Sequence, residues 1–223
     1  MIYIAPSLLS ADFSTLNTEI KRVRDAGAKY LHLDVMDGAF VPNITFGPDV
    51  IACIRKGTDM FFDVHLMIKR PERYIDRFVK AGADSITIHY EACENPMSVI
   101  NLIRSYEMRV GVAISPNTPV EYLYPLVEYI DMALIMTVEP GFGGQSLIPE
   151  TLDKVHALKK YVSERGLDID IEVDGGIKPE NIGLVTSAGA NIIVAGSAIF
   201  KSKKPRSTIQ AMKESAAENP YKG

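Results

Sequence analysis

Three segments of the chain place acidic and histidine side chains at every second position. They are Tyr30-Leu-His-Leu-Asp-Val35, Phe62-Asp-Val-His-Leu-Met67 and Ile169-Asp-Ile-Glu-Val-Asp174. Alternate residues of a β-strand point to the same face, so each segment predicts a strand with one apolar face and one ionisable face. Ionisable groups on a face that a packed sheet would bury indicate a site rather than core.

Four of these side chains stand near the ends of their predicted strands: His32, Asp34, His65 and Asp174. Burying an unpaired carboxylate is costly, so such a group needs hydrogen-bond partners, mutual pairing or a cation. Two imidazoles and two carboxylates suit Zn²⁺, Fe²⁺, Mn²⁺ or Co²⁺. We therefore predict a divalent metal site. The alternative is a hydrogen-bonded polar layer without an ion.

Glycine-rich turns follow the last three predicted strands. They are Pro140-Gly-Phe-Gly-Gly-Gln145, Asp174-Gly-Gly176 and Gly196-Ser197. Glycines expose backbone N–H groups, and a following helix N-terminus adds positive potential, which together suit a phosphate dianion. Each turn alone is an ordinary connection, but three in consecutive loops favour a phosphate site.

These segments belong to a regular alternation of strands and amphipathic helices. Strands are predicted at 2–7, 30–36, 60–67, 84–89, 108–114, 131–138, 168–174 and 191–196, and helices include 14–26, 71–81, 149–165 and 179–188. Ala-Gly-Ala recurs at 26–28, 81–83 and 188–190 between a helix and the next strand. We expect these three glycines, and also Gly57 and Gly166, to end helices in the left-handed conformation.

Eight strand-plus-helix units predict parallel strands joined by crossover helices. We expect one (β/α)₈ barrel over 1–223 with no linker, and residues 215–223 as a frayed tail. The predicted ligands then lie at the carboxyl ends of the strands, where barrel enzymes hold their sites. An open doubly wound sheet is the alternative, but Ala5-Pro-Ser-Leu-Leu-Ser10 lacks its Gly-rich turn.

Composition limits the class of protein. The chain is 47% hydrophobic and 23% charged with a net charge of −4, which indicates a globular fold and no nucleic-acid partner. Two cysteines without paired spacing, Cys53 and Cys93, indicate a reducing compartment. No signal peptide or membrane-length apolar run is evident, so we predict a cytoplasmic protein without a membrane partner.

Seven motifs, which span Ile4 to Phe200, are similar to those of the ribulose-phosphate 3-epimerase family. They are Ala5-Pro-Ser-Leu-Leu-Ser-Ala-Asp-Phe13, His32-Leu-Asp-Val-Met-Asp-Gly38, Val41-Pro-Asn43, Asp63-Val-His-Leu-Met67, Pro140-Gly-Phe-Gly-Gly-Gln145, Glu172-Val-Asp-Gly-Gly176 and Ala195-Gly-Ser197. The resemblance implies a metal-dependent isomerase of the pentose phosphate pathway. It would invert C3 to interconvert D-ribulose 5-phosphate and D-xylulose 5-phosphate, and it would form a homodimer or homohexamer.

The resemblance also implies roles for individual residues. His32, Asp34, His65 and Asp174 would hold one divalent ion per subunit, with zinc expected first, and Asp34 and Asp174 would move the proton. Substrate would be contacted by Ser7, His65, Gly141, Phe142, Gly143, Gly144, Gly175, Gly176, Gly196 and Ser197. Met36, Met67 and Met136 also end inward-facing strand positions, so we expect them to cap the reacting carbon or, alternatively, to fill core space.

Two strand ends depart from the family's usual wording. The fourth ends His89-Tyr-Glu91, where a proline is expected in the middle, and the fifth ends Ser115-Pro116, where asparagine is usual. We expect both to shape the pocket wall without touching the metal ligands. Asp37 and Glu172 are expected to steady the ligands.

Three alternative functions remain. A D-allulose-6-phosphate 3-epimerase would use the same residues on a sugar one carbon longer. A phosphosugar decarboxylase of this barrel type needs Asp-x-Lys-x-x-Asp, whereas the comparable stretch here, Asp34-Val-Met-Asp37, has no lysine. A phosphosugar-binding barrel without catalysis would not need both Asp34 and Asp174.

Overall fold

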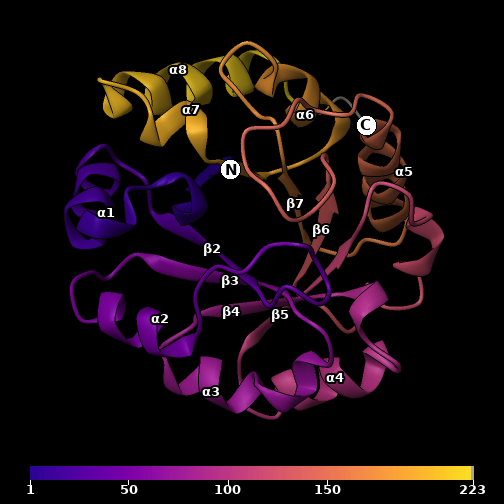
Figure 1. Cartoon of the computed structure of the whole chain (residues 1–223). Coiled ribbons are helices and arrows are strands. Elements are labelled where there is room, and N and C mark those ends of the chain that lie inside the picture. Colours follow the sequence, from indigo (N-terminus) through magenta and orange to yellow (C-terminus); the bar gives the residue numbers. More distant parts are fainter. Residues whose placement is uncertain (222–223) are drawn as a thin grey trace.

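A computed structural model describes residues 1–221 and shows eight parallel strands alternating with helices around a barrel (Figure 1). The strands are β1 (Tyr3–Pro6), β2 (Tyr30–Met36), β3 (Phe61–Met67), β4 (Ser85–His89), β5 (Arg109–Ile114), β6 (Met132–Met136), β7 (Asp170–Asp174) and β8 (Ile192–Ala195). Their order in the sheet is β1-β8-β7-β6-β5-β4-β3-β2. A parallel bridge between Ser7 and His32 joins its two edges. The predicted single (β/α)₈ barrel is therefore confirmed.

Helices surround the strands on the outside of the ring (Figure 1). They are α1 (Leu16–Asp25), α2 (Pro48–Arg55), α3 (Ile75–Lys80), α4 (Pro96–Arg104), α5 (Thr151–Glu164), α6 (Ile182–Ala188), α7 (Ser197–Phe200) and α8 (Pro205–Glu218). Between β5 and β6 the connection holds only a short 3-10 helix, η5 (Val120–Tyr122). Another 3-10 turn, η4 (Tyr90–Ala92), follows β4 directly.

Side-chain alternation divides the strands into two faces, as the sequence predicted. In β3, Phe62, Val64 and Leu66 are fully buried members of the core between the sheet and the helices. Asp63 and His65, on the opposite face, are just as inaccessible but lie inside the barrel. Burial of apolar side chains against the helices supplies most of the stability, at about 25 cal/mol for each Å² removed from water. It thereby holds ionisable groups in the interior.

Four of the five glycines predicted to end helices in the left-handed conformation do so. Gly27, Gly82 and Gly189 do have positive φ, at 99°, 91° and 120°, and so does Gly166. Gly57 follows α2 without left-handed geometry, so its predicted conformation was wrong.

The expected C-terminal tail also differs from the structure. Residues 215–218 form the last turn of α8, where Ala216 is buried in the core. Residues 222–223 of that predicted tail lie outside the described part of the chain.

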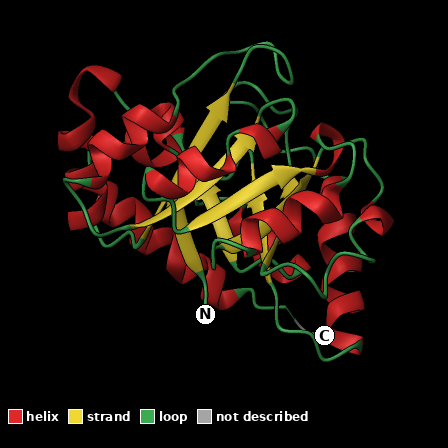
Figure 2. Cartoon of the chain, turned by 90° about the horizontal axis from the view of Figure 1, so that it is seen from below, coloured by secondary structure: helices red, strands yellow, loops and turns green. Residues whose placement is uncertain are grey.

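The strands are all parallel, and the arrows that can be followed in Figure 2 point away from the end of the barrel at which the N-terminus lies. Residues that end a strand are therefore brought to one rim. Within residues 1–221, none of the helices has the length and apolar character needed to cross a membrane.

Candidate metal and phosphosugar site

Four predicted ligand side chains meet inside this rim. His32 and Asp34 come from β2, His65 from β3 and Asp174 from β7, and one ligand atom of each lies within 4.8 Å of the others. Strand register produces the meeting, because Asp34 is paired with His65 across β2 and β3. Asp34 Oδ1 lies 3.3 Å from His32 Nε2 and 3.2 Å from His65 Nδ1. Asp174 Oδ2 lies 3.9 and 4.0 Å from the same two nitrogens.

His32 is oriented by a partner deeper in the barrel. Its Nδ1 donates to Asp63 Oδ2 at 2.7 Å, and Asp63 Oδ1 accepts from Ser85 Oγ at 2.7 Å. All three side chains are buried. In the neutral imidazole this hydrogen on Nδ1 leaves a lone pair on Nε2, an atom that is buried without a hydrogen-bond partner and faces Asp34. Orientation of a ligating imidazole by a carboxylate is common at metal sites.

The group fits a divalent cation. Four ligands at about 2.1 Å in a tetrahedron lie about 3.4 Å apart, close to the separations of 3.2–4.0 Å found here. An imidazole lone pair opposite a carboxylate oxygen is repulsive unless a proton or metal lies between them. The unpartnered Nε2 of His32 and the mixed nitrogen and oxygen donors therefore match an ion such as zinc.

The two carboxylates of the group have opposite tendencies to hold a proton. Burial alone would raise the pKa of Asp34, but the charge of His32 and the close approach of both imidazoles outweigh it and lower that pKa. Burial, reinforced by the negative charge of Asp34, raises the pKa of Asp174 to about 7. Ser7 Oγ donates to Asp34 Oδ2 at 2.6 Å, which also favours the ionised form of Asp34. One carboxylate can thus accept a proton while the other retains one.

His32 and Glu172 have raised pKa values for different reasons. Burial would lower the pKa of His32, but the charges of Asp34, Glu172 and Asp63 raise it well above 6.5. Burial and the neighbouring charge of Asp63 raise the pKa of Glu172 well above 4.5. Glu172 Oε1 lies 3.4 Å from His32 Nδ1, so Glu172 neighbours the imidazole it was expected to steady. Asp37 instead accepts hydrogen bonds from three backbone N–H groups, those of Ala39, Phe40 and Lys69.

A pocket of about 610 Å³, partly open to solvent, lies above the ligand group. Of the predicted site residues, it is lined by Ser7, Asp34, Met36, Met67, Met136, Gly141, Phe142, Gly143, Gly144, Asp174, Gly175, Gly176, Gly196 and Ser197. His65 is fully buried and does not line it. Carboxylates and methionines at the pocket floor and glycine loops at its mouth form a site for a small polar molecule with an anionic end.

Two of the pocket glycines are required by close packing. Gly176 has φ 71°, and a Cβ there would collide with the backbone of Leu147. Gly175 has φ 128°, and its Cβ would collide with the side chain of Val138. Glycine therefore lets the loop after β7 lie directly against the loop after β6, with its backbone exposed to the pocket.

Comparison with known proteins identifies the family. Residues 3–200 match the ribulose-phosphate 3 epimerase family. The chain belongs to this family. The ribulose-phosphate 3-epimerase of Synechocystis sp. is 50% identical, and the alignment covers 98% of this chain and 96% of that protein. The Bacillus subtilis ribulose-phosphate 3-epimerase is 47% identical, over 96% of this chain and all of the relative. The chain is accordingly an isomerase, an epimerase of carbohydrates.

Solved structures outside the family share the barrel. The 3-keto-L-gulonate-6-phosphate decarboxylase from Vibrio cholerae superposes with a TM-score of 0.71 over 98% of both chains, at 18% sequence identity. Such a likeness shows a common fold and no more. The sequence relatives in the epimerase family, and the absence of the decarboxylase lysine noted above, separate this chain from the decarboxylases.

The end of β4 lies closer to the metal ligands than the resemblance led us to expect. His89 Nε2 lies 2.9 Å from His65 Nε2, and His89 Nδ1 lies 3.1 Å from Glu91 Oε2. The expectation that this segment would not touch the metal ligands was therefore wrong. Ser115, at the other departing strand end, donates its backbone N–H to Glu91. Ser85, Thr87 and His89 alternate along β4, the pattern that revealed the other ligands, so the signal was present in the sequence.

Proposed function

We propose that this protein interconverts D-ribulose 5-phosphate and D-xylulose 5-phosphate: one of Asp34 and Asp174 removes the C3 proton and the other returns a proton to the opposite face, with a divalent ion at the site. One observation carries the proposal: the buried Asp34 and the partly buried Asp174, whose pKa values are shifted in opposite directions, belong to one group of side chains that could hold a metal ion at the floor of a glycine-rimmed pocket. Names of relatives at up to 50% identity support the choice of reaction.

Epimerisation next to a carbonyl needs two groups on opposite faces of a planar intermediate. One carboxylate takes the proton from C3, and the C–H electron pair enters the enediolate over C2 and C3. The other carboxyl then delivers a proton to C3 from the opposite face, and the reverse reaction exchanges the two roles. Asp34, kept ionised, suits proton removal, while Asp174, with a pKa near 7, suits proton delivery at neutral pH.

His32, Asp34, His65 and Asp174 would hold the ion, with zinc as the first candidate and Fe²⁺, Mn²⁺ or Co²⁺ as alternatives. When bound, a divalent cation would stabilise the negative charge that develops on the sugar oxygens O2 and O3. Hydroxyl donation from Ser7 fixes the second oxygen of Asp34, so that carboxylate keeps one orientation during the proton transfer.

The upper pocket would orient the substrate. Backbone N–H groups of Gly141 to Gly144, Gly175, Gly176, Gly196 and Ser197 are proposed to hold the phosphate, away from the carboxylates. Met36, Met67 and Met136 line the floor beside Asp34 and Asp174 and would give the reacting carbon a surface that neither donates nor accepts protons. A cytoplasmic location and a dimeric or hexameric assembly stay predictions.

Metal analysis of the purified protein, with initial rates on the two ketose phosphates, tests the proposal. We expect about one divalent ion per chain and a higher kcat/KM for D-ribulose 5-phosphate than for D-allulose 6-phosphate. Negligible turnover of the pentulose phosphate, with turnover of the hexulose phosphate, would replace the substrate assignment. Full activity after complete removal of metal would contradict the role given to the ion.

A further inference from the structure

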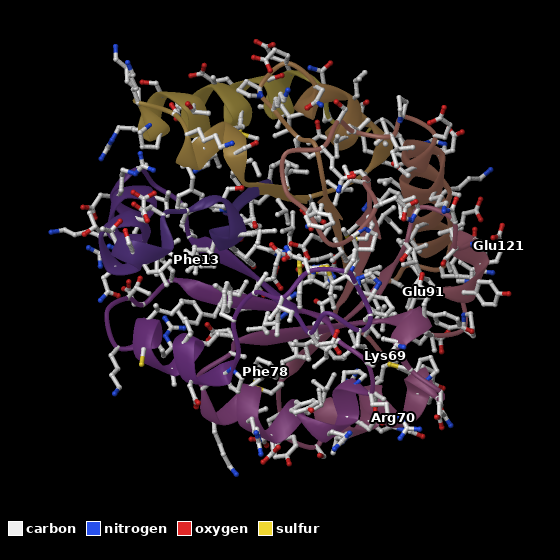
Figure 3. The ribbon with its side chains drawn as sticks, in the orientation of Figure 1. Phe13, Lys69, Arg70, Phe78, Glu91 and Glu121 are labelled. Carbon is white, nitrogen blue, oxygen red and sulfur yellow. The ribbon has the colours of Figure 1, made fainter. Side chains whose placement is uncertain are left out.

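A chain of hydrogen-bonded side chains leads outward from the metal group: His65, then His89 at the end of β4, then Glu91. His65 Nδ1 faces Asp34 and Asp174, its Nε2 meets His89 Nε2, and His89 Nδ1 meets Glu91 Oε2. Both histidines are fully buried. Figure 3 labels Glu91 between the central strands and the outer residue Glu121, so it lies at the outer end of this chain.

Glu91 fixes the direction of every hydrogen bond in the chain. Its Oε1 accepts from the backbone N–H of Ser115 at 2.7 Å and from Thr118 Oγ1. With Glu91 as acceptor, the hydrogen of His89 sits on Nδ1, so His89 Nε2 is an acceptor. His65 must then carry its own hydrogen on Nε2 to donate to His89. Its Nδ1 therefore keeps the lone pair that points at the metal group.

The loop that holds Glu91 is itself fixed from a helix. Lys154 Nζ on α5 donates to the backbone carbonyls of Ser115, Pro116 and Thr118 at 3.4, 2.5 and 2.6 Å. Both donors to Glu91 Oε1 are therefore held in place, and the Ser115 N–H, which can only donate, requires an acceptor atom at that position.

We propose that His89 and Glu91 are positioning residues that set the tautomer of His65, so that Nδ1 is available as a metal ligand. His32 has a carboxylate, Asp63, on the nitrogen that faces away from the metal group, whereas the corresponding nitrogen of His65, Nε2, is linked to the carboxylate of Glu91 through a second imidazole. Partners of this kind typically contribute about tenfold to a hundredfold in metal affinity. The inference rests on the proposed function, because it assigns these residues to the same metal site.

Glu91→Gln keeps the size of the side chain but reverses the direction of the hydrogen bonds that link residue 91, His89 and His65. The amide oxygen must face the Ser115 N–H, so the amide NH₂ faces His89 Nδ1 and donates to it. His89 then carries its hydrogen on Nε2 and donates to His65, which shifts the His65 hydrogen to Nδ1 and blocks the ligand atom. His89→Gln is the rescue variant, because its amide can accept from His65 and donate to Glu91. Glu94→Gln, at an exposed carboxylate that pairs with Arg70, is the matched control.

Two measurements on the full-length chain test the proposal: the zinc Kd by competition with a chromophoric chelator, and imidazole tautomers by ¹⁵N NMR of the metal-free protein. We expect Glu91→Gln to raise Kd about tenfold to a hundredfold, His89→Gln to stay within about threefold of wild type, and Glu94→Gln to match wild type. The His65 hydrogen should move from Nε2 to Nδ1 only in Glu91→Gln.

A wild-type Kd in folded Glu91→Gln, or a wild-type His65 with its hydrogen on Nδ1, would overturn the proposal. If Glu91→Gln does not fold, a wild-type His65 with its hydrogen on Nε2 and a His89→Gln Kd within about threefold of wild type would support the proposal. A wild-type His65 with its hydrogen on Nδ1 would overturn it. Absence of zinc binding by the wild-type protein would defeat the proposed metal function. The relay of tautomers would still be supported by a His65 hydrogen on Nε2, so the two failures are distinguishable.

Discussion

Replacing Asp63 by asparagine removes the charge behind His32 and keeps the size of the side chain. The bond from His32 Nδ1 to Asp63 Oδ2 is 2.7 Å long, and both side chains are inaccessible to solvent. A hydrogen bond to a charged group is worth about 1.5–3 kcal/mol and a neutral one about 0.5–1.5 kcal/mol. The asparagine oxygen still accepts from His32, and its NH₂ can donate to Ser85 Oγ. The midpoints of the two ranges differ by about 1.25 kcal/mol, which weakens zinc binding about eightfold.

Isothermal titration or chelator competition on the Asp63→Asn variant measures this loss. Asp76→Asn on α3, which removes a carboxylate that pairs with Lys80 on the protein surface, is the control and should leave the zinc Kd unchanged. Circular dichroism should show that both variants fold. A folded Asp63→Asn variant whose zinc Kd lies within twofold of wild type would refute the claim that Asp63 supports His32 as a ligand.

Two further predictions concern pH and the phosphate loops. Zinc binding by the metal-free protein should strengthen about tenfold per pH unit as pH rises toward 7, because His32, whose pKa is raised, must release a proton before Nε2 can bind metal. A zinc Kd that titration at fixed ionic strength shows to be independent of pH between 5 and 7 would contradict this. Gly176→Ala should raise KM for the ketose phosphate about tenfold or more, because the Cβ collides with the backbone of Leu147 and displaces the N–H groups proposed to hold the phosphate. An unchanged KM in steady-state kinetics of the folded variant would contradict the role of this loop in holding the phosphate.

Alternation within single strands was enough to predict much of the site. The spacing of His32, Asp34 and His65 identified inward-facing groups, and the carboxyl ends of parallel strands placed them with Asp174 at one rim. Such patterns depend only on the two-residue period of a strand, which holds wherever a strand forms.

Contacts between strands were harder to predict. The bond between His32 and Asp63 and the contact between His65 and His89 depend on lateral register and side-chain rotamers, neither of which the period of a strand reveals. His89 shows the same alternation as the recognised ligands, but its partner Glu91 lies beyond the strand, in a 3-10 turn held by the loop after β5.

Predictions about the ends of helices were right in some places and wrong in others, because they too depend on contacts that the local sequence does not show. Ala-Gly-Ala correctly marked three left-handed turns, because each glycine leads from a helix into the next strand. Gly57 lies in a similar place after α2, but its turn closes without positive φ. The C-terminal segment looked polar and frayed, yet Ala216 packs into the core from α8, a tertiary contact that local composition does not show.

Solvent deuterium at C3 tests the central claim, two-carboxylate proton transfer, most directly. D-ribulose 5-phosphate incubated in D₂O with the metal-loaded protein should return D-xylulose 5-phosphate that carries deuterium at C3, by NMR. Asp174→Asn should stay folded and lose at least about a hundredfold in rate, since one of the two proton-transfer groups is absent. Product without deuterium at C3, or a near-wild-type rate in Asp174→Asn, would contradict the account.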